Sequence, residues 1–173
     1  ALEDFDAEAS CFTFCGVVCP LTGDWRNVLG DDFDWIVNSG ATLTPGTGPE
    51  DDITIGGNYI YIETNGNNCA SGESAMLYSS CFNLDKAGKD SCHLSFNYHM
   101  RGISVGSLRL QASDDGGFNW QTLWQDNGNQ GEEWKKAYIS LNQYPQGTGL
   151  QLRFEATKGL GVYGDIGLDH IQL

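Results

Sequence analysis

Short segments in which apolar and polar residues alternate recur along the chain, and stretches rich in glycine separate them. The clearest are residues 92–100 and 107–113, where every second residue is apolar. A period of two is typical of β-strands that turn one face toward a core, and helical periodicity is nearly absent. Further strands are predicted at residues 32–37, 58–63, 74–80, 120–124, 136–141, 150–156 and 164–173.

The regular spacing of these nine or ten strands predicts an all-β fold, most simply a jelly-roll β-sandwich of two antiparallel sheets. Residues 114–117 read Asp-Asp-Gly-Gly and predict a hairpin turn. Residues 11–31 carry three cysteines and predict an irregular, tethered region. Because the composition does not shift along the chain, residues 1–173 are predicted to form a single domain.

The apolar positions of the last segment, residues 164–173, change face halfway along. Ile166 and Leu168 share one face, whereas Ile171 shares the other face with Asp169. Either a bulge shifts the phase or both faces of the strand are covered. In both cases Asp169 lies near apolar residues, where a carboxylate is costly unless hydrogen bonds or a cation compensate it.

The chain also opens with acidic residues, since residues 3–8 read Glu-Asp-Phe-Asp-Ala-Glu. Chain ends often lie close together in a domain, so we expect the first and last strands to be neighbours. The acids would then form an oxygen-rich site for a hard cation such as calcium. The alternative is that these carboxylates are solvated surface charges.

The charge balance is strongly acidic, with 9 Lys plus Arg against 23 Asp plus Glu and a net charge of -14. This balance argues against binding of nucleic acid or of anionic membranes, and its simplest role is solubility. The sequence holds no apolar run of about 18 residues, so no membrane span is predicted. No signal-type segment opens it, and any targeting peptide is therefore expected to have been removed.

An even number of cysteines favours disulfides and therefore a secreted or extracellular location. Zinc is the alternative, but the first three cysteines are separated by three residues each and no histidine lies among them. A bond between Cys81 and Cys92 is favoured because a short connection joins them. The six residues are Cys11, Cys15, Cys19, Cys69, Cys81 and Cys92.

Catalysis is not predicted. Only three histidines are present, and neither a Gly-x-Ser-x-Gly nor a His-Glu-x-x-His motif occurs. A glycosidase that uses two carboxylates remains open by counting alone. The acids, however, fall in predicted turns and near the chain ends.

An ordered series of short motifs runs along nearly the whole chain. It begins with Asp4-Phe5-Asp6, continues with Cys92-x-Leu94-x-Phe96-x-Tyr98-His99-Met100-x-Gly102, and closes with Gly164-Asp165-Ile166-Gly167-Leu168-Asp169-His170-Ile171. This series resembles the MAM domain, an extracellular module named for meprin, A5 antigen and the mu receptor phosphatase. The resemblance implies a two-sheet jelly roll without catalysis, used in adhesion or recognition, with Trp35, Trp124 and Trp134 in its core.

The resemblance also implies a cation between the start of the chain, the loop around Asp52 and the final strand. Carried over by position, the ligands would be Asp6, Asp52 and Asp169, with Asp4 as a further candidate. The ion is expected to be calcium with a structural role. Asp6 stands where the family has Glu, so its side chain is one methylene shorter.

Two departures from the family pattern concern the cysteines. The family's usual partner of Cys92 is missing, which implies that Cys92 pairs elsewhere or stays free. Cys11, Cys15 and Cys19 form an insertion. Together with the turn at residues 113–120, this insertion is similar to MAM-type modules of secreted bacterial proteins that accompany polysaccharide-degrading enzymes.

Aromatic residues beside glycine in predicted loops are candidates for glycan contact, because an exposed ring stacks on the apolar face of a sugar. These are Trp25, Trp120 and Tyr163, each of which would equally serve as a lid on the sandwich. Asn97 and His99 lie on the polar face of the strand at 92–100 and are added as candidates. Solvation or bonds to neighbouring groups would also explain these two.

The sequence therefore predicts a secreted, non-catalytic module that binds a polysaccharide or other glycan and holds a structural calcium ion. It would be a monomeric unit of a larger protein and keep an attached enzyme near its polysaccharide. The alternative function is adhesion between proteins, as in animal MAM domains. A passive folded spacer is the third possibility.

Overall fold

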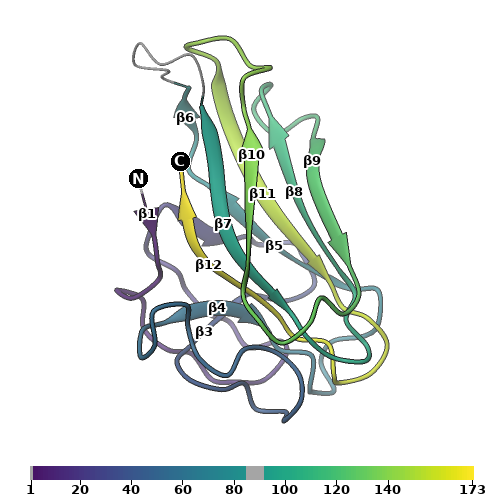
Figure 1. Cartoon of the computed structure of the whole chain (residues 1–173). Helices are drawn as coiled ribbons and strands as arrows, with labels where there is room; N and C mark the ends of the chain where they lie inside the picture. The colour runs from purple at the N-terminus through teal and green to yellow at the C-terminus, as the bar shows by residue number, and fades with distance from the viewer. Residues whose placement is uncertain (1, 85–91) are drawn as a thin grey trace.

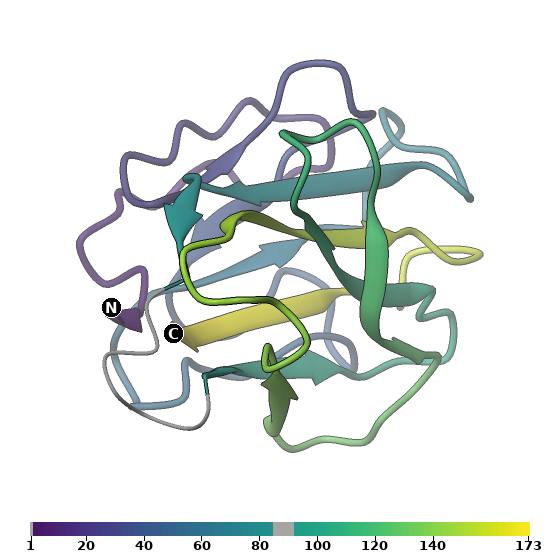
Figure 2. The ribbon, with the colours of Figure 1, turned by 90° about the horizontal axis from the view of Figure 1, so that it is seen from above.

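A computed structural model describes residues 2–84 and 92–173. Within them the chain forms two antiparallel sheets and no helix, which confirms the predicted fold class (Figure 1). The sheet with strand order β10-β7-β12-β4-β3, in which β1 also pairs with β12, is called the terminal sheet. The sheet with order β2-β5-β11-β8-β9, in which β6 also pairs with β11, is called the hairpin sheet. Figure 2 shows the two sheets as layers.

The strands are β1 (Leu2–Glu3), β2 (Trp25–Asn27), β3 (Ile36–Asn38), β4 (Tyr59–Ile62), β5 (Ser74–Ser79), β6 (Phe82–Asn83), β7 (His93–Met100), β8 (Ser107–Ser113), β9 (Gln121–Asn127), β10 (Lys135–Ser140), β11 (Gly149–Thr157) and β12 (Ile166–Gln172). All nine predicted strands are present. Strands β1, β2 and β6 were not predicted, because segments of two or three residues show no periodicity.

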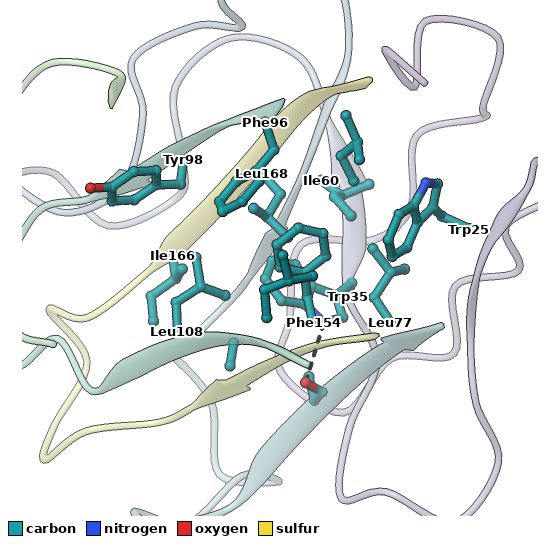
Figure 3. Close-up of a cluster of buried hydrophobic side chains, with 14 of the residues drawn as sticks. Trp25, Trp35, Ile60, Leu77, Phe96, Tyr98, Leu108, Phe154, Ile166 and Leu168 are labelled. Atoms are coloured by element: carbon teal, nitrogen blue, oxygen red, sulfur yellow. Dashed lines mark hydrogen bonds between the residues drawn. The ribbon is translucent and has the colours of Figure 1, made fainter. Parts of the chain in front are cut away.

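The core lies between the sheets and is rich in aromatic rings (Figure 3). Phe96 of β7 meets Phe154 of β11 with the ring centroids 4.8 Å apart, and Trp124 of β9 packs on the same Phe96 ring at 5.0 Å. Trp35 is fully buried and donates a hydrogen bond from Nε1 to the Ala75 carbonyl at 3.3 Å. Such edge-to-face contacts add to the free energy gained by burying apolar surface. Trp134 was also predicted to lie in the core, but it is partly buried and packs against Tyr59 and His99 on the outer side of the terminal sheet.

The two ends of the described chain lie side by side, as we expected (Figures 1 and 2). Strand β1 pairs with β12, with Glu3 opposite Ile171. In β12 a register shift falls between Asp169 and Gln172, where His170 has a φ of 49°. A bulge therefore changes the phase of the final strand, and the residues before it are buried on both faces.

Two disulfides staple the N-terminal segment, Cys11–Cys19 and Cys15–Cys69. The predicted bond between Cys81 and Cys92 is wrong, because both of these thiols are free. Cys81 leads into β6, which belongs to the hairpin sheet, whereas Cys92 precedes β7 of the terminal sheet. The short connection in sequence thus joins two different layers of the sandwich.

In the part of the chain that the structure describes, no helix is long and apolar enough to cross a membrane.

Candidate functional site

Trp25 is not an exposed ring as predicted, since only 6% of its surface is accessible. It lies on β2, which pairs with β5, and alternation along β2 turns its ring into the sandwich. There it packs on Phe154 with the ring centroids 5.3 Å apart, and Figure 3 shows it among the core residues. Burial removes Trp25 from the candidate glycan contacts.

Asn97 and His99 do not line an open groove, because only 8% and 2% of their surfaces are accessible. They lie on the outer side of β7, but other parts of the chain fold over this side of the terminal sheet. His99 donates from Nε2 to the Glu132 carbonyl at 2.9 Å, and Trp134 packs against its ring. Burial lowers the pKa of His99, so the ring stays neutral without open access to solvent.

The cover over β7 and β12 is held by Trp134, which donates from its indole nitrogen to the Asp51 carbonyl at 2.9 Å. Underneath lies Gly167 of β12. A β-carbon at this position would come within 3.1 Å of the Trp134 ring and 3.0 Å of Pro49. Glycine therefore allows the cover to lie close to the sheet.

Tyr163 is 43% exposed and lies in the connection between β11 and β12. Its backbone bonds to Ser104, which precedes β8, whereas Trp120 follows the turn after β8. The two predicted ring contacts are therefore at opposite ends of the same strand. The structure does not bring them into one site.

The outer side of the hairpin sheet carries a polar row that crosses all five strands of its main path. The cross-strand partners in this row are Arg26, Tyr78, Arg153, Gln111 and Thr122, in the order β2-β5-β11-β8-β9. Neighbouring residues of such a row point to the same side of the sheet and are close enough to interact. Trp120 lies beside this row, at the end of the hairpin turn.

Hydrogen bonds fix the middle of the row. Arg153 donates from Nε to Gln111 at 2.7 Å and from Nη1 to the Tyr78 hydroxyl at 2.9 Å. The Arg153 guanidinium lies over the Trp120 ring, 4.2 Å from its centroid, and the Tyr78 ring meets Trp120 edge to face at 5.2 Å. Trp120 is held by a bond from its indole nitrogen to the Gly117 carbonyl at 3.1 Å. We call Arg26, Tyr78, Gln111, Trp120 and Arg153 the arginine–aromatic face.

The next outward row holds a bidentate ion pair. Arg109 of β8 donates from Nε and Nη2 to the two carboxylate oxygens of Glu155 on β11, each at 2.8 Å. The bond to Glu155 raises the pKa of Arg109. Two parallel bonds of this kind hold both side chains in one geometry. The arginine–aromatic face therefore continues into a rigid, neutral border.

Of the predicted glycan contacts, only Trp120 lies on this face, and Tyr78, Gln111 and Arg153 were not among them. A signal existed in the alternation of residues 107–113 and 150–156, which assigns Gln111 and Arg153 to the outward side. The sequence could not show that these two side chains are cross-strand neighbours under the same tryptophan. That juxtaposition depends on the pairing of β8 with β11.

The predicted metal ligands come together in part. A β-carbon on Gly57 would collide with both Asp6 Oδ1 and Asp52 Oδ2, so these two oxygens converge on one point. Asp6 Oδ1 also accepts a bond from Asn58 N at 2.7 Å. Asp169 Oδ2 accepts from Ile53 N at 3.3 Å, which ties the final strand to the Asp52 loop.

Asp4 takes a different role, since its carboxylate accepts a hydrogen bond from the backbone N–H of Asp6 at 3.3 Å. Asp169 is fully buried, and desolvation raises its pKa to about 6 although the neighbouring His170 opposes this. Asp52 Oδ1 is buried and has no hydrogen-bond partner among the described residues. In the same part of the chain, no group of three or more His, Cys, Asp or Glu side chains is arranged to hold a metal.

A second pair of buried acids was not singled out in the sequence. Glu63 ends the segment that contains β4, and Asp165 precedes β12; both are at most 1% exposed. Asp165 Oδ1 accepts from Thr64 N and Oγ1 at 2.9 and 2.8 Å, and Glu63 accepts from the Tyr61 hydroxyl at 3.0 Å. Desolvation raises the pKa of Glu63 to about 7 and that of Asp165 to about 6.

The described residues thus form an antiparallel sandwich in which one outer sheet face is covered and the other is partly open. The family model of the MAM domain, meprin/A5/mu, matches residues 4–173, and the chain belongs to this family. It is 33% identical over 181 residues to MAM domain-containing glycosylphosphatidylinositol anchor protein 2 of Mus musculus, covering 98% of this chain. It is 35% identical over 151 residues to neuropilin-1 of Xenopus laevis, covering 86% of this chain.

The chain spans 18% of the length of the mouse protein and 15% of that of the frog protein. Both relatives are animal proteins, so the expected bacterial subtype of the family is not supported. The cysteine insertion was therefore not a sufficient signal of origin.

Among solved structures, the K1 cleaved adhesin domain of Lys-gingipain from Porphyromonas gingivalis W83 is similar, with a TM-score of 0.64 and 16% identity. The match covers 99% of this chain and 95% of that one. TmCBM61 in complex with β-1,4-galactotriose has a TM-score of 0.50 and 16% identity over 85% of both chains. At these identities the likeness shows the sandwich fold alone.

Proposed function

We propose that this chain is an extracellular, non-catalytic module that binds a glycan on the arginine–aromatic face. The observation that carries the proposal is the preformed arrangement of Tyr78, Trp120 and Arg153, in which the buried Gln111 holds Arg153 in place. Rings that lie beside fixed hydrogen-bonding side chains suit sugars, which present apolar ring faces and hydroxyl groups together. Because these side chains are already held by one another, little conformational entropy is lost when a ligand binds.

Two features support binding rather than catalysis. The carboxylates beside this face are already engaged, since Glu155 pairs with Arg109 and Asp115 accepts bonds from Ser113 and Asn119. The three histidines lie elsewhere, on β7 and β12. None of the five residues that define the face is a carboxylate, so the face offers ring contacts and hydrogen bonds rather than a general acid.

Adhesion between proteins is the second candidate function. It is favoured by membership of the MAM family and by the likeness to relatives that are named as glycosylphosphatidylinositol anchor proteins. In that case the same open face, or the exposed residues at the sandwich ends, would contact another protein. Size measurements over a range of protein concentrations separate the two functions, because a self-adhesive module forms dimers in the absence of glycan.

The direct test is affinity electrophoresis against a panel of soluble plant and marine polysaccharides, followed by calorimetry. We expect retardation by at least one polymer and a loss of about tenfold or more in affinity for Trp120→Ala, since stacking contributes on the order of 1–3 kcal/mol. Tyr138→Ala is the matched control, because Tyr138 is 70% exposed on β10 of the other sheet. No retardation by any polymer, or equal losses for both variants, would exclude this site.

We further propose that calcium binds where Asp6 and Asp52 converge, in a structural role. Two carboxylates that meet above Gly57 repel each other, and Asp52 Oδ1 has no hydrogen-bond partner among the described residues. A hard cation satisfies both conditions, with backbone oxygens and water completing its shell. Asp169 would act mainly by anchoring the Asp52 loop through Ile53 N. The ion would stabilise the contact between the two chain ends.

A further inference from the structure

The arginine–aromatic face differs in charge from the rest of the molecule. The net charge of the chain is -14, and it contains four arginines. Three of them, Arg26, Arg109 and Arg153, lie on the outer side of the hairpin sheet. This sheet face is therefore a local concentration of guanidinium groups on an acidic protein.

The three arginines are not equivalent, because only Arg109 is neutralised. Its partner Glu155 accepts both of its parallel bonds. Among residues 2–84 and 92–173, neither Arg26 nor Arg153 forms an ion pair with a carboxylate. Two positive charges on this face thus have no counter-charge in the described part of the protein.

These two guanidinium groups also keep N–H groups that no described residue accepts. Arg153 bonds to neutral acceptors through Nε and Nη1, and its Nη2 makes no bond to a described residue. Arg26 is exposed and uses only Nε, which donates to the Gly23 carbonyl at 3.1 Å. A guanidinium group carries five N–H donors in a planar fork that matches a carboxylate or a sulfate.

Acids that border the face are directed elsewhere. Asp31 and Asp32 accept hydrogen bonds from the backbone of β5 at Met76 and Ser74. Asp115 is bonded within its own turn. At physiological ionic strength charges are screened over about 8 Å, so a ligand that lies on Arg26 and Arg153 interacts mainly with the charges next to it.

We propose that the glycan bound here is anionic, with carboxylate or sulfate groups that pair with Arg153 and Arg26 on either side of Tyr78. Trp120 and Tyr78 contact the sugar rings. The two arginines lie on β2 and β11, two strand spacings apart, or roughly 10 Å. This spacing suits an extended polymer that carries repeated acidic groups. The inference rests on the proposed glycan-binding function and specifies its ligand class.

The test compares each polymer with its neutralised form. Affinity gels contain polygalacturonate or its carboxyl-reduced counterpart, and κ-carrageenan or its desulfated counterpart. We expect the wild type to bind at least one anionic polymer about tenfold or more tightly than the neutral polymer of the same backbone. The polymer pair that shows the difference identifies the acidic group as carboxylate or sulfate.

Substitutions then locate the selectivity. The double variant Arg26→Gln/Arg153→Gln should bind the anionic and the neutral polymer equally, and Arg26→Gln alone should lose part of the difference. Arg26→Gln leaves the Arg153–Trp120 stack intact, so it reports on charge without disturbing the aromatic contacts. The charge-matched control is Lys135→Gln/Lys136→Gln on β10, which should keep the wild-type selectivity. Thermal unfolding verifies that each variant is folded.

Three outcomes would count against the inference in distinguishable ways. Tighter binding of a neutral polymer by the wild type leaves the proposed function in place and overturns the anionic ligand. Selectivity that persists in the double variant places the anion contact elsewhere and overturns the roles of Arg26 and Arg153. Absence of binding to all four polymers and to the wider panel overturns the glycan function itself.

Discussion

The two outer sheet faces of this sandwich are built from similar strands but differ in their exposure to solvent. On the terminal sheet, the polar side of β7 is buried beneath Trp134 and the loop that contains Asp51. On the hairpin sheet, the polar side of β8 and β11 is only partly buried, since Gln111 and Glu155 are buried but Arg109 and Arg153 are half-exposed, and Arg153 lies beside Trp120. The alternation of apolar and polar residues predicted the outward side of the strands in both sheets equally well. The difference shows that covering loops decide which face is available to a ligand.

The two faces also differ in how they treat charge. The covered side holds the fully buried Asp169, whose pKa is raised by desolvation. The open side holds arginines whose charge is exposed or paired with Glu155. Buried carboxylates are sensitive to pH and cations, whereas exposed guanidinium groups are suited to recognition. We therefore assign stability to the covered face and binding to the open one.

Removing the cover gives the largest expected effect. Trp134→Ala deletes the ring contacts with Tyr59 and His99, at 5.7 and 5.4 Å, and the bond to the Asp51 carbonyl. We expect a loss of about 3 kcal/mol in the free energy of unfolding, measured by urea denaturation. Glycan affinity at a temperature where the variant is folded should stay unchanged. A large drop in affinity would show that the covered side takes part in binding.

A change of pH should have a smaller effect than the loss of Trp134. The free energy of unfolding should fall by on the order of 2 kcal/mol as the pH rises from 4 to 8. The pKa of Glu63 is raised to about 7 and those of Asp165 and Asp169 to about 6. The folded protein therefore binds protons more tightly than the unfolded chain. The stabilisation that these three acids contribute is complete below their pKa in the unfolded chain, and it is lost as the pH rises through 6 and 7.

Urea denaturation at pH 5 and pH 8 measures this dependence. Glu63→Gln is the informative variant, because it removes one charge of the buried pair and should flatten the curve. A stability that does not change over this range in the wild type would contradict the assignment.

Calcium should stabilise the protein by roughly 1.4 kcal/mol at a concentration tenfold above its dissociation constant. The thermal midpoint should rise with added calcium and fall again with a chelator. Gly57→Ala should abolish this response, because its β-carbon would occupy the point where Asp6 and Asp52 converge. Gly56→Ala would strain the backbone, because Gly56 has a φ of 91°. The control is therefore Asp4→Asn. An unchanged midpoint with calcium in the wild type would remove the cation from this site.

Tyr163→Ala should have the smallest effect. The ring is 43% exposed at the end of β8 far from Trp120, so stability should change by less than about 0.5 kcal/mol. Glycan affinity should equal that of the wild type in the same electrophoresis assay. A clear loss of affinity would extend the binding site along the whole sheet face.

Much of the fold and part of the site could be predicted from the sequence. Alternation located the long strands, and the broken phase of residues 164–173 indicated the bulge that the structure places after Asp169. The first and last strands were correctly expected to be neighbours. Trp25 and His99 were misplaced because a three-residue strand buries the first and a distant loop covers the second. No local pattern encodes either event.

The sequence by itself determined that this chain is an acidic, disulfide-containing β-sandwich of the MAM family. The reason is that periodicity, cysteine content and ordered motifs are local properties of the chain. Only the tertiary structure decided which side of each sheet is exposed and which side chains meet across strands. Arg153 and Tyr78 become neighbours because β11 pairs with β5, and residues separated by 75 positions meet only when that pairing forms.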